Sequence, residues 1–102
     1  MAPQSDLHDV LQAIMGEDKV YFQPPPSLQV VEPCIVYHRD NADTRFADNT
    51  SYRYTQRYTV IYIDRAPDRE DILAQIARLP MCLYQRWYTV NNLNHDAFVL
   101  YF

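Results

Sequence analysis

Apolar residues near the start of the chain recur at the spacing of one helix face, which predicts an amphipathic helix that ends before Gly16. Ser5 is suited to cap this helix, and Asp6 and Asp9 fall in its first turn, where the helix dipole favours acidic side chains. Gly16 is a natural stop, because glycine readily adopts the left-handed conformation that ends many helices. The apolar stripe consists of Leu7, Val10, Leu11, Ile14 and Met15.

Alternating and continuous apolar segments predict four strands. In the longest, tyrosines alternate onto one face, and both faces become apolar from Val60 to Ile63, which predicts burial on both sides at that end. Pro33 within the first predicted strand indicates a break, a bulge or an edge position. The four strands are expected at Leu28–Tyr37, Ser51–Asp64, Met81–Val90 and Ala97–Phe102.

A second helix is predicted between the long strand and the third strand. Asp68 is placed to cap it, Asp71 follows three residues later in a capping-box-like position, and Pro80 ends it. Asn91–His95 is predicted to be a turn, so the last two strands should pair antiparallel. The apolar stripe of this helix consists of Ile72, Leu73, Ile76 and Leu79.

The order of elements, α-β-β-α-β-β, predicts one α+β domain over residues 1–102. We expect an antiparallel sheet of about four strands with both helices on one face. The polar stretch His38–Thr50 is expected to be an irregular loop. The hydrophobic terminal strand should be central in the sheet or covered by a neighbouring subunit, because an exposed edge of this kind aggregates.

Composition excludes several classes of function. The chain has a single glycine, whereas loops that cradle phosphates need several, so P-loop and dinucleotide chemistry is excluded. No apolar run reaches the length of a membrane helix, and the first residues lack the pattern of a signal peptide, so we expect a cytosolic chain without membrane contact. The net charge of −4 disfavours a nucleic-acid binder but suits a wall past which DNA slides without sticking.

Groups that could carry chemistry are sparse. Cys34 and Cys82 lie far apart among apolar neighbours, so we expect free, buried thiols rather than a nucleophile. None of the three histidines pairs with a cysteine at the spacing of a metal site. Neighbours on a strand point to opposite faces, so His38–Asp40 and His95–Asp96 are not expected to form acid–base pairs. We therefore expect no enzyme, no cofactor and no metal.

The most informative segment is Tyr52–Tyr58, where tyrosines are interleaved with arginines. It could form a protein–protein interface, in which both residue types are common anchors, stack the bases of a single strand, or be an ordinary half-exposed strand. The acidic balance disfavours nucleic acid, and arginines at a subunit contact need acids opposite them. The candidate interface residues are Phe46, Tyr52, Arg53, Tyr54, Arg57 and Tyr58, with Asp40, Asp43 and Asp48 as candidate acids.

The second half of the chain, about Asp48–Phe102, resembles small neck or tail-completion proteins of long-tailed bacteriophages, and most closely their tail terminators. The Asn-Leu-Asn-His turn and the Leu-Tyr-Phe ending are the more specific signals. The segments that carry the resemblance are Tyr58–Asp64, Ala66–Asp68, Leu79–Cys82, Arg86–Tyr88 and Asn91–Phe102.

The resemblance implies an α+β subunit that forms a ring, expected to be a homohexamer, on the last ring of the tail tube. Such a ring stops tube growth and joins the tail to the head connector or head-closure protein, while DNA passes through its channel without specific binding. The protein would be made in the host cytoplasm and reside in the neck of the virion, and the resemblance carries over no catalytic residues. Two alternatives stay open: another neck component such as a head-closure protein, and a single-stranded nucleic-acid-binding module that uses the tyrosine–arginine strand.

Overall fold

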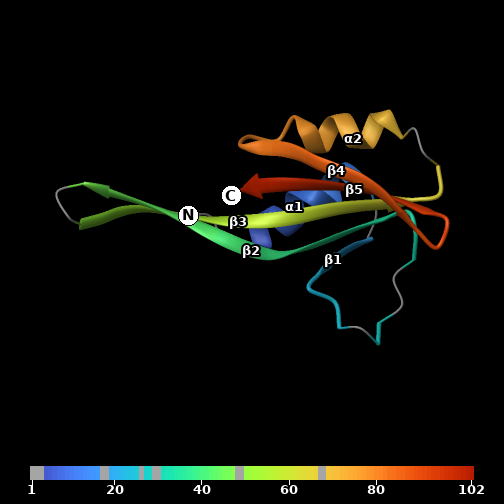
Figure 1. The fold of residues 1–102 in the computed structure, drawn as a ribbon, viewed down its shortest axis with the longest axis horizontal. Coiled ribbons are helices and arrows are strands. Elements are labelled where there is room, and N and C mark those ends of the chain that lie inside the picture. Colours follow the sequence, from blue (N-terminus) through green and yellow to red (C-terminus); the bar gives the residue numbers. More distant parts are fainter. Residues whose placement is uncertain (1–3, 17–18, 26, 29–30, 48–49, 67–68) are drawn as a thin grey trace.

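The computed structural model describes residues 4–16, 19–25, 27–28, 31–47, 50–66 and 69–102, with side chains except those of 41–47 and 50–55. These residues form two helices and five strands in the order α1-β1-β2-β3-α2-β4-β5 (Figure 1). The helices are α1 (Gln4–Met15) and α2 (Glu70–Ala77). The strands are β1 (Val20–Phe22), β2 (Cys34–Ala47), β3 (Thr50–Asp64), β4 (Cys82–Val90) and β5 (Leu93–Tyr101).

The strands form one mixed sheet in the order β1-β2-β3-β5-β4. β1 runs parallel to β2, and every other neighbouring pair is antiparallel. The α+β class is confirmed, but the expected purely antiparallel sheet of about four strands is wrong. The additional strand is β1, whose three residues are too short to show a periodic pattern.

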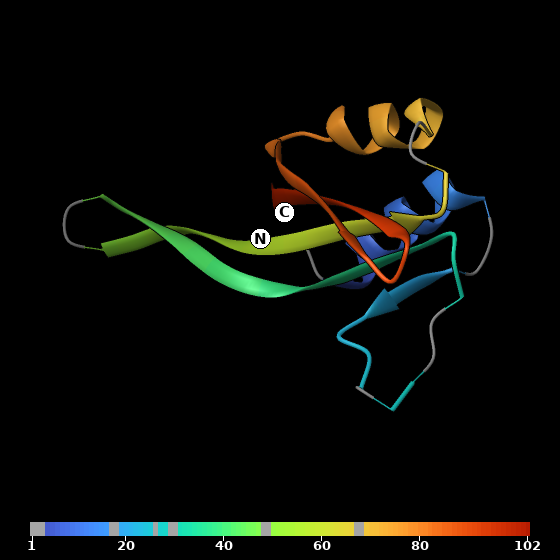
Figure 2. The ribbon, with the colours of Figure 1, turned by 45° about the vertical axis from the view of Figure 1, so that its right-hand side comes forward.

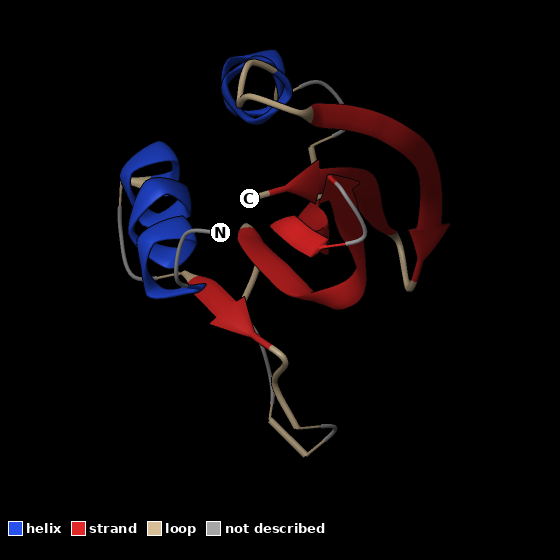
Figure 3. Ribbon diagram, turned by 90° about the vertical axis from the view of Figure 1, so that its left-hand side faces the viewer, coloured by secondary structure: helices blue, strands red, loops and turns tan. Residues whose placement is uncertain are grey.

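Both helices pack on the same face of the sheet, as Figure 3 shows in a view along the strands. Leu7 and Leu11 from α1 and Ile72 and Ile76 from α2 share a single core with the sheet. Tyr58 and Tyr62 of β3 contribute to this core together with Val60, because side chains two residues apart on a strand lie on one face. The sheet residues of this core are Val20, Ile35, Tyr37, Tyr58, Val60, Tyr62, Phe98 and Leu100.

The helix ends follow local chemistry only in part. α1 ends as predicted: Gly16 has a φ of +76°, and its N–H donates to the carbonyl of Gln12 at 2.8 Å. Ser5 lies inside this helix rather than at its cap, because α1 already begins at Gln4. α2 begins after Arg69, which makes no side-chain capping bond, while the predicted cap Asp68 lies outside the described residues.

The polar stretch expected to be a loop is mostly strand. β2 continues to Ala47 and β3 starts at Thr50, and the two pair along their length. β1 pairs with β2 only as far as Tyr37, and β5 pairs with β3 only from Arg57 onward, so the outer part has two strands alone. We call residues 40–47 and 50–56 the arm. It projects from the helix-covered body, and the molecule measures 50 × 28 × 24 Å (Figures 1 and 2).

The terminal strand β5 is central, which is one of the two arrangements expected from its hydrophobicity. It pairs with β3 on one side and with β4 on the other, so β4 is an edge strand. Asn91 and Asn92 connect β4 to β5 with positive φ angles of 53° and 61°, as a tight two-residue hairpin requires.

Candidate subunit interface

The described residues contain no group of three or more His, Cys, Asp or Glu side chains that could hold a metal ion. His95 and Asp96 take separate partners: the ring of His95 stacks on Tyr88 at 4.9 Å, and the carboxylate of Asp96 accepts a hydrogen bond from the Tyr84 hydroxyl at 2.8 Å. The two side chains therefore form no acid–base pair. No helix among the described residues is long and apolar enough to cross a membrane.

Both cysteines are free, as expected, but only Cys34 is fully buried, while Cys82 is half-buried. Burial raises the pKa of the Cys34 thiol to about 11, and burial also raises the pKa of Cys82. A nucleophilic cysteine needs a lowered pKa, so neither thiol has the environment of a reactive site.

Tyr58 belongs to the core and not to an exposed interface, contrary to prediction. Only 3% of its surface is accessible, and its ring lies 6.0 Å from that of Tyr37. The alternation of side chains on β3 places Tyr58 on the face that the helices cover, together with Val60 and Tyr62. The body therefore covers the inner end of the tyrosine–arginine strand.

Arg57 finds its acid within its own chain. Its Nε lies 3.1 Å from Oδ2 of Asp40, and the Thr59 hydroxyl donates to the same oxygen at 3.2 Å. The pKa of Arg57 is raised, chiefly by hydrogen bonding to Tyr101 and to a smaller extent by hydrogen bonding to Asp40. Arg57 thus has an acidic partner within one copy, and its pairing with an acid of a neighbouring subunit stays a prediction.

These polar residues meet at the base of the arm. The register between β2 and β3 shifts between Arg39 and Asn41, which makes Asp40 the irregular residue at the point where the arm leaves the body. One residue before Asp40 and one before Arg57, a second contact joins the same strands. Nε and Nη2 of Arg39 donate to Oε1 of the buried Gln56 at 3.1 and 2.8 Å. The charged side chains of Arg39, Asp40 and Arg57 thus tie the two strands together at this point.

The other candidate residues lie further out. The backbones of Asp43, Phe46, Tyr52, Arg53 and Tyr54 belong to the paired strands of the arm, but their side chains lie outside the described residues. Asp48 lies outside the described residues altogether. In the register of the arm, Asp43 lies opposite Thr55, and Arg53 lies opposite Arg45. The chain therefore brings Asp40 and Arg57 together, buries Tyr58 in the core and places Asp43, Phe46, Tyr52, Arg53 and Tyr54 along the arm.

The sequence analysis did not predict that strand β4 carries most of the exposed large apolar side chains among the described residues. Leu83, Tyr84 and Trp87 expose 68%, 52% and 56% of their surfaces. The guanidinium of Arg86 lies 4.8 Å from the ring centre of Tyr88 on the same strand. The aromatic content of this segment was a signal, but it predicted only a strand, because the sequence does not show which strand lies at the edge of the sheet.

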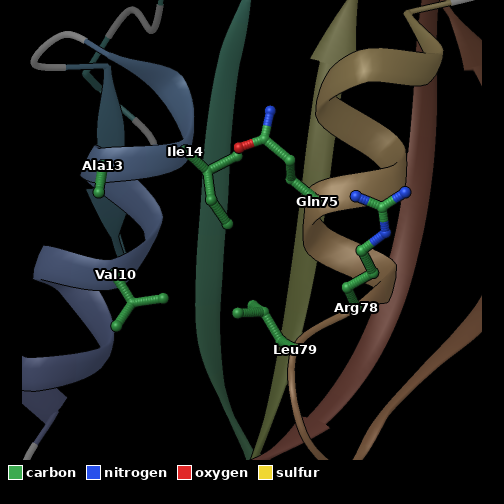
Figure 4. Close-up of a pocket in the computed structure, with 6 residues that line it drawn as sticks. All are labelled: Val10, Ala13, Ile14, Gln75, Arg78 and Leu79. Carbon is green, nitrogen blue, oxygen red and sulfur yellow. The ribbon is translucent and has the colours of Figure 1, made fainter.

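A shallow apolar groove separates the two helices (Figure 4). It has a volume of about 380 Å³, and Arg78 is its one charged lining residue. A second hollow, of about 340 Å³, lies between α2 and the sheet beside Tyr84 and Phe98. These open hollows suit packing of apolar side chains more than chemistry on a small molecule. The remaining residues that line the first groove are Val10, Ala13, Ile14, Gln75 and Leu79.

A comparison with models of known protein families and with curated proteins finds no match to this chain. The resemblance to phage tail terminators therefore remains a prediction from the sequence, and the arguments that follow rest on the fold and its surfaces.

Proposed function

We propose that this chain is a structural virion protein that forms a ring at the head-proximal end of a phage tail. The ring ends growth of the tail tube and joins the tail to the head connector or head-closure protein. Its partners are copies of itself, the tail-tube protein and the connector. The observation that carries this proposal is the arm, a two-stranded extension that leaves the body of the subunit.

An isolated two-stranded ribbon is marginally stable in water, so a long arm gains stability when a second molecule packs against it. The arm also contains Phe46, Tyr52 and Tyr54 together with Arg45 and Arg53. Aromatic residues and arginine are the anchors that bury a large area at interfaces and still form hydrogen bonds. A subunit that reaches over its neighbour or onto the tube ring below would use these residues.

The charge of the chain supports a place around passing DNA. At a net charge of −4, the subunit has no excess of positive charge to hold phosphates. A ring of such subunits forms a channel that DNA crosses without specific binding. A channel that does not hold DNA suits the neck of a tailed phage. We expect the protein to be made in the host cytoplasm and to stay in the virion.

Native mass spectrometry and electron microscopy of the purified protein, alone and with tail-tube protein, test the proposal. We expect rings, of about six copies by the resemblance, that cap the tubes. Replacing residues 43–55 with Asn-Gly closes a tight hairpin after the paired residues Ala42 and Gln56 and removes the outer arm. This variant should keep the circular dichroism of a folded subunit but leave tubes overlong.

The outcomes separate the neck functions. A variant without the outer arm that still forms rings and stops tube growth would refute the role of the arm. If wild-type rings bind the head connector but never a tail tube, the chain is a head-closure protein and not a tail terminator. A chain that stays monomeric under all conditions would refute the ring itself.

A further inference from the structure

The arm meets the body where both flanking strands stop. β1 pairs with β2 only as far as Tyr37, and β5 pairs with β3 only from Arg57 onward. A two-stranded ribbon bends most easily out of its plane, because its backbone hydrogen bonds lie in that plane. The register shift at Asp40 adds to this tendency, since a bulge bends the strand that contains it. The angle between arm and body therefore depends on what holds the ribbon at this point.

Both outer edges of the ribbon are held by the residues that directly follow the flanking strands. On the β2 side, Oε1 of Gln23 accepts a hydrogen bond from the N–H of Arg39 at 3.1 Å. On the β3 side, the N–H of Phe102 donates to the carbonyl of Gln56 at 3.0 Å. Each bond carries the support of a flanking strand past its last paired residue.

A polar contact holds the face of the ribbon that the helices cover further along the strands. Arg39 and Gln56 each lie two residues from a core tyrosine, Tyr37 and Tyr58, so they share the face of these tyrosines. The guanidinium of Arg39 donates twice to Oε1 of Gln56, and only 4% of Gln56 is exposed. Hydrogen bonds with a charged donor are stronger than those between neutral groups.

A second polar contact holds the opposite face. Arg57 and Thr59 flank Tyr58 in the chain and therefore lie on the other side of β3. Oδ2 of Asp40 lies 3.1 Å from Nε of Arg57 and 3.2 Å from the hydroxyl of Thr59. Tyr101, which lies opposite Arg57 in the register of β5, is a further hydrogen-bond partner of Arg57. Bending of the arm toward either face would stretch the contact on the other face.

We propose that Arg39, Asp40, Gln56 and Arg57 form a joint that holds the arm at one angle to the body of the free subunit. The arm is then oriented before a partner arrives, so binding does not have to supply the free energy of orienting it. This deepens the proposed function and rests on it only for what the arm contacts.

A distance measurement in the monomeric chain tests the joint. One spin label is attached at Thr44→Cys in the arm and one at Thr89→Cys on the exposed strand β4. The background contains Cys82→Ala, and the remaining cysteine, Cys34, is buried. Double electron–electron resonance should give a single narrow distribution of distances between the two labels.

The joint is opened by Asp40→Ala with Gln56→Ala, which removes one partner on each face. The distribution of distances should become about twofold wider, because the arm then samples many angles. The matched control is Asp71→Ala with Gln85→Ala, which removes the same residue types at exposed positions away from the joint. Its distribution should be as narrow as that of the unchanged chain.

A second pair of labels shows whether the strands of the arm stay paired. Asp43 and Thr55 lie directly opposite each other, so labels at Asp43→Cys and Thr55→Cys broaden each other's spectrum in continuous-wave measurements. The variant with the opened joint should keep this broadening. If the broadening is lost, the four residues hold the strands together rather than set an angle, and the proposal is overturned.

The remaining outcomes distinguish the joint from the proposed function. If the unchanged chain already has a distribution as wide as that of the opened joint, the joint is wrong while the ring stands. If only the opened joint widens the distribution, the joint is supported, and rings of this variant should need about tenfold more protein to form. Rings that form at the same concentration despite a loose arm would overturn the role of the arm in assembly and leave the joint in place.

Discussion

The two cysteine residues differ in burial, and this difference sets the reactivity of their thiols. Cys34 is fully buried in β2 with a pKa of about 11, whereas Cys82 is half-buried at the start of β4. The thiolate is the reactive form, so at pH 8 only about one Cys34 thiol in a thousand is ionised. A thiol reagent such as DTNB should therefore modify Cys82 first and Cys34 only after unfolding. In Cys82→Ala the fast phase should disappear, and a fast phase that persists would show that Cys34 is accessible.

The buried carboxylate of Asp64 depends on three donors. The Tyr62 hydroxyl and the N–H of Ala66 donate to it, and Nη1 of Arg69 lies 3.3 Å away. Tyr62→Phe leaves this carboxylate with fewer partners, so we expect the free energy of unfolding to fall by about 1–2 kcal/mol. Urea unfolding followed by circular dichroism measures the change. Tyr88→Phe, at a half-exposed tyrosine, is the control and should cost less than about 0.5 kcal/mol. Equal losses in the two variants would contradict the role of the buried bond.

Among the secondary-structure elements, those with local signals were predictable. The end of α1 at Gly16 and the tight turn at Asn91 and Asn92 follow from the backbone conformations that these residue types tolerate. The arm was not predictable, because residues 40–47 are polar and read locally as a loop. Their pairing with the tyrosine-rich part of β3 determines their conformation, and strand formation depends on such cross-strand neighbours more than on intrinsic preference.

Only one part of the candidate interface was predictable from the sequence, namely the segment whose composition of tyrosine and arginine is unusual. The sequence identified the tyrosine–arginine strand as unusual, but the burial of Tyr58 depends on where the helices and β5 end, which the sequence of this strand does not show. Strand β4 was missed for a related reason. The insertion of β5 between β3 and β4 makes β4 an edge, and this long-range arrangement leaves no periodic signal in the sequence.

The arm should exchange its amide hydrogens faster than the body, because its two strands lack further neighbours. Asp40 links Arg57 and Thr59 at its base. In Asp40→Ala, we expect amides of 41–47 and 50–56 to exchange several-fold faster, while those of 60–63 stay unchanged. Hydrogen exchange with mass spectrometry measures this. Glu32→Ala, which breaks the exposed ion pair with Arg65, is the control. Unchanged arm exchange in Asp40→Ala would show that this residue does not anchor it.

Over the whole molecule, the arm and the two sheet edges are surfaces that one copy cannot cover. They point in different directions from a single core, so they can engage different neighbours at the same time. Exposed apolar side chains such as Leu83 and Trp87 on β4 are typical of surfaces that contact another molecule.

Net charge and the burial of Tyr58 together predict that the chain does not bind single-stranded nucleic acid. Stacking on Tyr58 would require it to leave the core, and the excess of acidic residues repels phosphates. In a fluorescence anisotropy titration with a labelled oligonucleotide at about 150 mM salt, we expect no binding up to about 100 µM protein. The variant with Asp6→Lys and Asp9→Lys, which raises the net charge from −4 to 0, is the control. Any binding it gains should weaken steeply as salt is added, because it comes from counterion release alone. Micromolar binding by the wild-type chain at 150 mM salt would instead favour a nucleic-acid-binding module over a ring through which DNA passes.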